Sequence, residues 1–77
     1  MEVSVKLISS FRKYQKRQGD DRVTLQEGGT VLDLVKELGL PEKYVRIITV
    51  NGKQENLHTV LSEGDTVFVF PPAIGGG

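Results

Sequence analysis

Short runs of alternating apolar and polar residues recur along the chain and predict strands. Residues 3–8 alternate with a period of two, which is the pattern of a strand with one buried face. The same alternation predicts a strand at residues 22–26, and a run rich in β-branched residues predicts another at 45–50. Residues 66–70 alternate again before two prolines, so they form the last predicted strand.

Residues 31–38 instead carry a helical pattern, with apolar side chains at i, i+3, i+4 and i+7. Thr30 precedes this run and Asp33 follows three residues later, so the two predict a short form of the capping box. Gly39 and Pro41 predict the end of the helix, because glycine favours the left-handed position after a helix and proline cannot continue one. We expect a core formed by Val31, Leu34, Val35 and Leu38 from the helix and by Val5, Leu25, Ile48 and Val67 from the strands.

The connections between the predicted strands differ in length. Asn51 and Gly52 are the preferred pair for a tight hairpin turn, which joins the third strand to a short partner at residues 53–55. Residues 10–21 are too many for such a turn, so the first two strands form a wide hairpin. Within it, Ser10 as a cap and the helix formers that follow predict a short helical turn.

One amphipathic helix with about four or five strands fits a two-layer α+β domain. The β-grasp, or ubiquitin-like, architecture has this element order: two strands, then a helix, then the remaining strands. We therefore predict a mixed four- to five-stranded sheet with one main helix packed across it, formed by residues 1–72. Residues 73–77 are predicted to be a flexible, glycine-rich reactive tail.

Composition narrows the classes of function. Ten Lys and Arg residues balance ten Asp and Glu residues, so no net charge draws the chain to nucleic acid or to an anionic membrane, and neither partner is expected. No apolar run approaches the roughly 20 residues of a membrane span, and no signal peptide pattern is present, so a cytoplasmic location is expected. Without cysteine, and with His58 as the one histidine, the chain is expected to bind neither a metal nor a cofactor.

Residues suited to catalysis are scattered, and no enzyme activity is predicted. His58 has no nearby Ser or Asp in the sequence to form a triad, so we interpret it as an exposed loop histidine. Gly28 and Gly29 before Thr30 have the composition of an anion-binding turn but lack the lysine of a P-loop, and we interpret them as a turn and a cap. Solvation in loops and turns explains the remaining acidic candidates, which are Asp20, Asp21, Glu42, Glu55, Glu63 and Asp65.

A basic segment follows the first predicted strand. It is either a docking surface for an acidic partner or RNA, or a solvated loop face. The solvated face is favoured because Asp20 and Asp21 follow directly and offset part of the charge. The segment consists of Arg12, Lys13, Lys16 and Arg17, interleaved with Phe11 and Tyr14.

Phe68 and Phe70 share one face of the last predicted strand, and Val67 and Val69 share the other. If the valines meet the helix, the two aromatic side chains remain on the outer face, because so few elements cannot cover both sides of a sheet. We interpret them as a partner-binding patch, since aromatic residues anchor interfaces.

The residues after the last strand predict a reactive tail. Pro71 and Pro72 predict a stiff, extended exit with no donors for further sheet pairing. Gly75, Gly76 and Gly77 have no side chains, so the terminus is able to thread a narrow channel and leave its carboxylate open to attack. An isolated glycine end is ordinarily a frayed terminus, but behind a β-grasp pattern it indicates function.

The whole chain resembles the MoaD/ThiS family of ubiquitin-like sulfur carrier proteins, most closely its molybdopterin synthase small-subunit branch. The resemblance begins in the first strand and continues through Asn51-Gly52 and the turn at Glu63-Gly64-Asp65. Its specific part is the ending Phe70-Pro71-Pro72-Ala73-Ile74-Gly75-Gly76.

The resemblance implies how the tail works. In that family an ATP-dependent adenylyltransferase, similar to the ubiquitin-activating enzymes, adenylates the terminal carboxylate, and sulfur from a persulfide replaces AMP to give a thiocarboxylate. The tail then enters the large subunit of molybdopterin synthase and donates sulfur to the precursor of the molybdenum or tungsten cofactor. ATP is therefore used by the partner. The implied reactive end is Gly77 with Gly76 and Gly75, and the implied partner-binding residues are Phe68, Phe70, Pro71, Pro72 and Ile74.

Several alternatives stay open. The chain has one glycine beyond the family's usual pair, so the reactive residue is Gly77 or, after trimming, Gly76. A triple-glycine ending also occurs among sulfur carriers for thiamine thiazole synthesis, against which Pro71 and Pro72 argue. The other classes are a ubiquitin-like modifier that forms isopeptide bonds through Gly77, and a plain interaction domain with a glycine linker.

Overall fold

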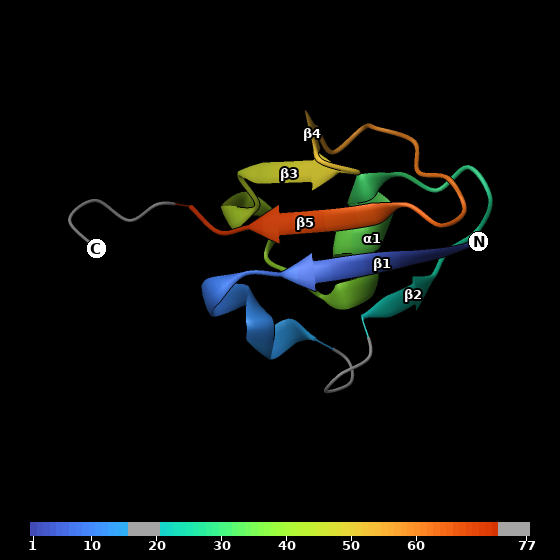
Figure 1. The fold of residues 1–77 in the computed structure, drawn as a ribbon. Helices are drawn as coiled ribbons and strands as arrows, with labels where there is room; N and C mark the ends of the chain where they lie inside the picture. The colour runs from blue at the N-terminus through green and yellow to red at the C-terminus, as the bar shows by residue number, and fades with distance from the viewer. Residues whose placement is uncertain (16–20, 73–77) are drawn as a thin grey trace.

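The computed structural model describes residues 1–15 and 21–72 and shows a five-stranded sheet with one α-helix against it (Figure 1). The strands lie in the order β2-β1-β5-β3-β4, with β1 and β5 parallel and the other neighbouring pairs antiparallel. The predicted mixed sheet and β-grasp architecture are therefore confirmed. In chain order the elements are β1 (Glu2–Leu7), the 3₁₀ helix η1 (Ser9–Tyr14), β2 (Arg22–Thr24), α1 (Val31–Leu38), the 3₁₀ helix η2 (Glu42–Tyr44), β3 (Ile47–Val50), β4 (Lys53–Glu55) and β5 (Thr66–Phe70).

Strand β5 lies at the centre of the sheet, between β1 and β3. Val67 is opposite Val5 of β1 on one side and Val50 of β3 on the other. Val67 and Val69 are completely buried. Hydrogen bonds from both neighbours therefore hold the strand that leads to the C-terminal tail.

Helix α1 begins and ends as predicted. The hydroxyl of Thr30 accepts a hydrogen bond from the Asp33 N–H (3.3 Å), and the Asp33 carboxylate accepts one from the Thr30 N–H (2.9 Å), so both halves of the capping box form. Gly39 ends the helix with a φ of 72°, which glycine adopts without strain. The N–H of Leu40 then donates to the carbonyl of Val35 (3.1 Å), and the Leu40 side chain is buried. In the described parts of the chain, no helix has the length and apolar character needed to cross a membrane.

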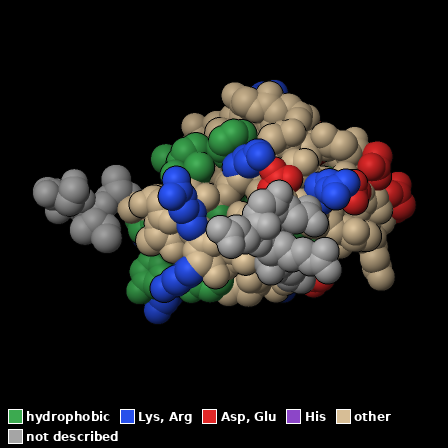
Figure 2. Space-filling model, turned by 60° about the horizontal axis from the view of Figure 1, so that its bottom comes forward, with side chains coloured by type: hydrophobic (Ala, Val, Ile, Leu, Met, Phe, Trp, Pro, Cys, Tyr) green, Lys and Arg blue, Asp and Glu red, His purple; other side chains and the backbone are tan. Residues whose placement is uncertain are grey.

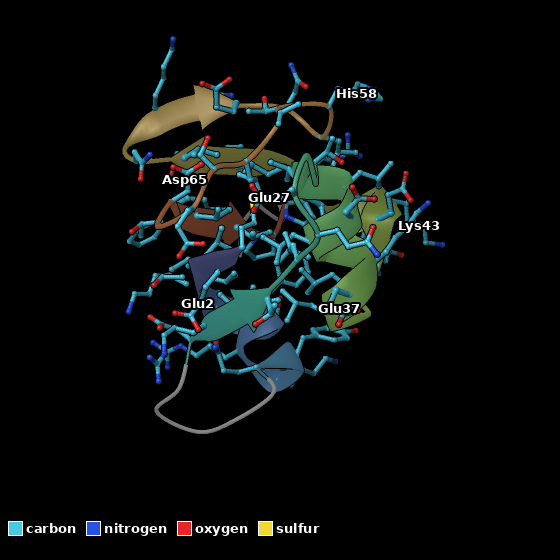
Figure 3. The ribbon with its side chains drawn as sticks, turned by 90° about the vertical axis from the view of Figure 1, so that its right-hand side faces the viewer. Glu2, Glu27, Glu37, Lys43, His58 and Asp65 are labelled. Carbon is cyan, nitrogen blue, oxygen red and sulfur yellow. The ribbon has the colours of Figure 1, made fainter. Side chains whose placement is uncertain are left out.

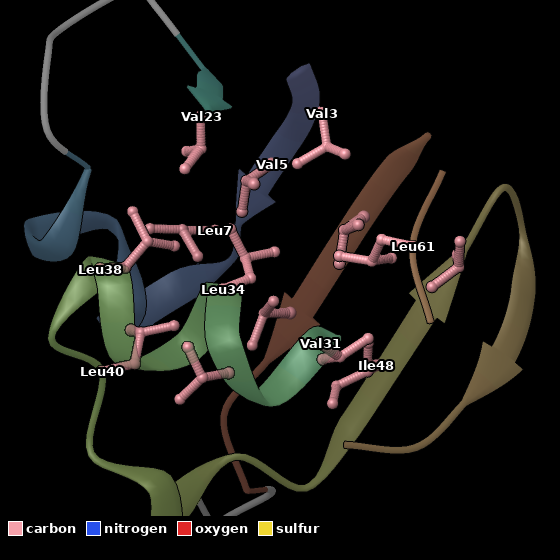
Figure 4. Packing of buried hydrophobic residues seen from close by; sticks show 14 of the residues in the cluster. Val3, Val5, Leu7, Val23, Val31, Leu34, Leu38, Leu40, Ile48 and Leu61 are labelled. Carbon is pink, nitrogen blue, oxygen red and sulfur yellow. The ribbon is translucent and has the colours of Figure 1, made fainter. Parts of the chain in front are cut away.

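A continuous core fills the space between the sheet and α1 (Figure 4). Every residue that the sequence predicted for the core is buried. Phe11, Leu40 and Leu61 are also buried, and the sequence did not predict them as core residues. No polar or charged side chain is buried within residues 1–15 and 21–72. The buried residues are Val3, Val5, Leu7, Phe11, Val23, Leu25, Val31, Leu34, Val35, Leu38, Leu40, Ile48, Val50, Leu61, Val67 and Val69.

Asn51 and Gly52 form the predicted tight turn between β3 and β4. Their φ angles, 53° and 84°, are both left-handed, as the type I′ hairpin turn requires. The Asn51 side chain also fixes the start of β5. Its amide nitrogen donates to the Asp65 carboxylate (2.9 Å), and its oxygen accepts from the Thr66 N–H (2.9 Å).

The helical turn predicted after the first strand exists as η1, but its predicted cap is wrong. Ser10 lies inside η1, and Ile8 precedes the helix with no side-chain capping bond. Ser9 has a φ of 54°, so the chain turns sharply at Ser9, and the N–H of Phe11 donates to the carbonyl of Ile8 (3.0 Å). The burial of Phe11 fixes this turn against the core without a polar cap.

Two predicted strands are shorter in the structure. Strand β2 ends two residues before the predicted boundary. Strand β3 begins at Ile47, because the N–H of Val45 donates to the carbonyl of Glu42 in η2 (3.0 Å) and so is not part of the sheet. Both differences lie at element ends, where the apolar pattern alone does not fix the boundary.

Candidate functional site: the outer sheet face and the C-terminal tail

The outer face of β5 carries the two aromatic side chains that the sequence predicted there. Phe68 and Phe70 are half-buried, while Val67 and Val69 point into the core. The two phenyl rings stack with centroids 6.2 Å apart and planes 18° apart. In Figure 1, α1 lies behind the sheet, and no described element covers β5 on the near side. The position of the aromatic pair is confirmed, and its role in partner binding stays a prediction.

Ile47 extends this aromatic pair across the sheet, which the sequence analysis did not predict. It lies directly opposite Phe70 in the β3–β5 ladder and is 46% exposed. The signal was the alternation in residues 45–50, since burial of Ile48 and Val50 leaves Ile47 on the outer face. We call Ile47, Phe68 and Phe70 the outer-face patch.

Lys6 borders the outer-face patch on the β1 side. It lies opposite Phe68 in the parallel β1–β5 ladder, and its side chain is half exposed. Its ammonium group forms a salt bridge with Asp21, in the segment just before β2. This ion pair ties the wide hairpin to the sheet, and the Asp21 carboxylate offsets the charge of Lys6 beside the outer-face patch.

The tail begins at the end of β5. Pro71 and Pro72 are half-buried and follow the strand without further sheet pairing, as predicted. The predicted flexible tail, with Ile74 and the glycines from residue 75 onward, lies outside the described residues, so its predicted role stays a prediction. Because β5 is the central strand, the base of the tail has a fixed position relative to the outer-face patch.

A groove lies beside the base of the tail, and the sequence analysis did not predict it. It has a volume of about 490 Å³. Segments from three parts of the chain form it: η1, the residues around η2, and the two prolines after β5. Its apolar lining consists of Phe11, Tyr14, Pro41, Tyr44, Pro71 and Pro72. We call it the tail-exit groove.

The structure divides the predicted basic segment between core and surface. Phe11 is only 3% exposed and belongs to the core, so it is not an exposed aromatic of a docking surface. Arg12 and Lys13 are exposed, as the solvated-face interpretation expects. Lys16 and Arg17 lie outside the described residues.

Two of the acidic candidates, Asp65 and Glu63, are not simply solvated as predicted but accept hydrogen bonds that hold the fold. The Asp65 carboxylate accepts hydrogen bonds from the Asn51 side chain (2.9 Å) and from the Ser62 N–H (2.8 Å). The Glu63 carboxylate accepts one from the Glu2 N–H (2.9 Å). Figure 3 shows Glu2, Glu37 and Asp65 at separate places around the fold. Within the described ranges, no group of three or more His, Cys, Asp and Glu side chains is arranged to hold a metal ion.

The helix N-terminus after the glycine turn has no donors directed at an external anion. The N–H groups of Val31 and Leu32 donate to the carbonyls of Thr59 (3.0 Å) and Leu57 (2.9 Å), in the loop after β4. The Asp33 N–H is bonded to the Thr30 hydroxyl. The interpretation of this segment as a turn and a cap is therefore confirmed.

His58 lies in the same loop and is exposed, as predicted. Its backbone N–H donates to the side-chain oxygen of Asn56 (2.8 Å). Figure 3 shows its ring at the edge of the fold, away from the labelled acidic residues. None of the acidic residues labelled in Figure 3 is therefore placed to share a proton with the His58 ring.

A model of the Mut7-C ubiquitin family matches residues 3–74, which include the described sheet, apart from Glu2, and the first residues of the tail. The chain belongs to the Mut7-C ubiquitin family. The ubiquitin-like character predicted from the sequence is thereby confirmed for this Mut7-C ubiquitin protein. No curated protein matches it.

Solved structures of a molybdopterin converting factor subunit and of archaeal modifier proteins are similar to the chain. It is 32% identical to a putative molybdopterin converting factor subunit 1 from Pyrococcus furiosus, over 94% of this chain and 98% of that one, with a TM-score of 0.69. It is 27% identical to small archaeal modifier protein 1 from Methanosarcina acetivorans, over 99% and 96% of the two chains, with a TM-score of 0.66. A complex of subunits 1 and 2 of molybdopterin-converting factor from Helicobacter pylori shares the fold, at 23% identity over 99% and 100% of the chains and a TM-score of 0.58.

Proposed function

We propose that the chain is a sulfur carrier whose C-terminal glycine is adenylated and then converted to a thiocarboxylate, which donates sulfur for molybdopterin biosynthesis. In this proposal it is the small subunit of a molybdopterin synthase and is not itself an enzyme. The observation that carries the proposal is its similarity, at 32% identity and nearly full length, to a putative molybdopterin converting factor subunit 1.

The geometry at the end of the sheet supports this role. A carrier must present its terminus to more than one protein while the rest of its surface stays constant. Strand β5 is paired with β1 as far as Val69 and with β3 as far as Phe70, so the tail leaves from a fixed point. The outer-face patch lies beside that point, so one partner surface is able to contact the patch while it receives the tail.

The proposed chemistry takes place on the terminal carboxylate. ATP converts the carboxylate of Gly77 to an acyl-adenylate and releases pyrophosphate. The outer sulfur of a protein persulfide then attacks the acyl carbon, the acyl–phosphate C–O bond breaks, AMP leaves and an acyl disulfide forms. A second thiol of the sulfur-supplying protein attacks the sulfur of the cysteine that carried the persulfide, so the S–S bond breaks, the thiocarboxylate leaves and the two cysteines are left as a disulfide. Glycine suits this position because it has no side chain to obstruct the narrow site of an adenylating enzyme.

Two partners follow from the proposed function. The first is an adenylyltransferase similar to the ubiquitin-activating enzymes, which supplies the ATP site. The second is a large synthase subunit, which supplies the catalytic residues for sulfur transfer. The Helicobacter pylori neighbour, solved as a complex of subunits 1 and 2, supports a two-subunit arrangement.

Intact-mass spectrometry of the protein purified from its native host tests the proposal. Exchange of one carboxylate oxygen for sulfur adds about 16 Da at the C-terminus. We expect this species, and we expect it to disappear when the adenylyltransferase gene is deleted. Its absence from cells that make molybdopterin would contradict the proposal.

A second candidate function is protein modification, which the similarity to small archaeal modifier protein 1 favours. A modifier would use the same activated glycine but transfer it to a lysine amine, so that an isopeptide bond forms and AMP leaves. The same mass spectrometry separates the two functions, because a modifier gives glycine remnants on lysines of other proteins.

A further inference from the structure

The tail-exit groove has an aromatic, apolar interior that no element of the described chain fills. Phe11 is buried at its base, and its ring meets Tyr14 edge to face, with centroids 6.2 Å apart. Tyr44 is 48% exposed, which is unusual for a large ring next to two prolines and a second tyrosine. Exposed aromatic side chains around a concave surface are typical of an interaction site.

Two lysines hold their charges beside the groove's aromatic rings. The Lys13 ammonium nitrogen lies 5.6 Å from the centre of the Tyr14 ring, and that of Lys43 lies 5.2 Å from the centre of the Tyr44 ring. Both distances are in the range of cation–π contacts. Both lysines are exposed, so each positive charge lies close to an aromatic ring of the groove and is accessible to a partner.

The charges of this end of the molecule are strongly one-sided. η1 and η2 together carry Arg12, Lys13 and Lys43 against one acidic residue, Glu42. Lys13 is the one charged residue in the lining of the groove. Figure 2 shows hydrophobic side chains and Lys and Arg side chains together at the end of the molecule where β5 ends, whereas most Asp and Glu side chains in view lie at the opposite end. Among the described residues, η1 and η2 therefore give this end of the molecule a local positive charge, although the net charge of the chain is zero.

We propose that the tail-exit groove binds an acidic segment of the protein that receives the tail, with one aromatic or leucine side chain inserted between Tyr14 and Tyr44. Carboxylates on either side of the inserted side chain meet Lys13 and Lys43. This inference rests on the proposed function only for the identity of the partner, because the groove and its charges are present whatever chemistry the tail performs.

An acidic peptide segment fits the groove better than the alternative occupants. Nucleic acid needs a longer basic track, and the interior of the groove is apolar. A second copy of the chain is disfavoured because three of the carboxylates at its far end are already engaged within the fold: Asp65 and Glu63 in hydrogen bonds, and Glu27 in an ion pair with the N-terminal amine. A partner segment is able to supply both the inserted apolar group and unengaged carboxylates.

Peptide selection on the full-length chain tests this inference directly. A phage-displayed library of random dodecapeptides is selected on the immobilised protein, and the most enriched peptide is synthesised and titrated into ¹⁵N-labelled protein. We expect enriched peptides to carry one Phe, Trp or Leu flanked by Asp or Glu. We expect the amide shifts to concentrate at Phe11, Tyr14 and Tyr44 and to leave Phe68 unchanged.

Charge-reversal variants identify the lysines that matter. Lys43→Glu alone should raise the dissociation constant of the peptide by about two- to fivefold, in line with the loss of an exposed ion pair. The double variant Lys13→Glu/Lys43→Glu should raise it by at least about tenfold. Lys53→Glu is the matched control, because Lys53 follows the Asn51 turn at the other end of the sheet. It makes the same change in charge and should leave binding unchanged. Tyr44→Ala should also weaken binding while the melting temperature stays close to that of the parent.

Several outcomes would overturn the inference. In the selection, these are enrichment of peptides without acidic residues and no enrichment at all. In the binding measurements, these are equal peptide affinity for the double variant and the parent, and amide shifts centred on the outer-face patch. Shifts at the groove that appear when the protein alone is concentrated would identify a second copy as the occupant instead. None of these outcomes depends on thiocarboxylate formation, so failure of this inference is distinguishable from failure of the proposed function.

Discussion

Ile47 and Phe70 lie directly opposite each other in the last pair of the β3–β5 ladder, on the face of the sheet away from the helix. Directly opposite residues of an antiparallel pair bring their side chains close enough for contact. Phe68 stacks on the Phe70 ring from the same strand, so the three residues form one apolar surface. That surface ends where the tail begins. A partner that binds this face of the sheet therefore also holds the base of the tail in a fixed position.

Phe70→Ala should weaken the complex with the tail-receiving enzyme by about 1–3 kcal/mol, because truncation removes a central aromatic anchor of the outer-face patch. The dissociation constant is measured by isothermal titration calorimetry with the adenylyltransferase of the same host. The terminal carboxylate is unchanged in this variant, so saturating concentrations should still give thiocarboxylate.

Val60→Ala is the matched control for that measurement. Val60 is 60% exposed and lies in the loop that crosses the start of α1, away from the end of β5. It loses apolar surface as Phe70→Ala does, but it should bind like the parent. Equal affinities for Phe70→Ala and the parent would remove the patch from the interface.

Leu34→Ala should lower the free energy of unfolding by about 2–5 kcal/mol, since Leu34 is completely buried between α1 and the sheet. A domain of this size has little stability to lose, so the variant is expected to be partly unfolded at physiological temperature. Urea denaturation followed by circular dichroism gives the difference. Leu32→Ala makes the same substitution on the half-exposed face of the same helix and should cost much less.

Thr30→Ala should lower the free energy of unfolding by about 1 kcal/mol, because it removes the hydroxyl that accepts from the Asp33 N–H. Thr30→Ser keeps that hydroxyl and should restore most of the loss. Thermal denaturation of the two variants and the parent measures both effects. A Thr30→Ser protein as unstable as Thr30→Ala would show that the methyl group of Thr30, and not the cap, is what matters.

The sequence predicted those parts of the site that depend on local periodicity. Alternation alone placed Phe68 and Phe70 on the face opposite Val67 and Val69, because successive side chains of a strand point to opposite faces. The signals that predicted the helix and its cap are also local in the sequence, since they depend on residues three or four positions apart.

The parts that the sequence did not predict depend on which segments meet in space. No local pattern showed that β5 lies between β1 and β3, so the position of Ile47 opposite Phe70 was not foreseen. The tail-exit groove joins Tyr14, Tyr44 and Pro71, which are far apart in the sequence. Phe11 was interpreted as part of an exposed basic segment because its burial depends on how η1 packs against the sheet.

Deletion of Gly76 and Gly77 should abolish thiocarboxylate formation and leave recognition intact. Without these residues the terminus falls short of the catalytic centre of the adenylating enzyme, whereas the outer-face patch lies on the sheet and is unchanged. We expect the truncated protein to bind the adenylyltransferase within about threefold of the parent, because the patch carries most of the affinity. ATP-dependent thiocarboxylate formation is followed by intact mass, and binding by calorimetry. Deletion of Gly77 alone leaves the usual family pair of glycines, so formation of a thiocarboxylate on that variant would identify Gly76 as a competent terminus. Formation of a thiocarboxylate on the variant that lacks both residues would contradict the assignment of the reactive end.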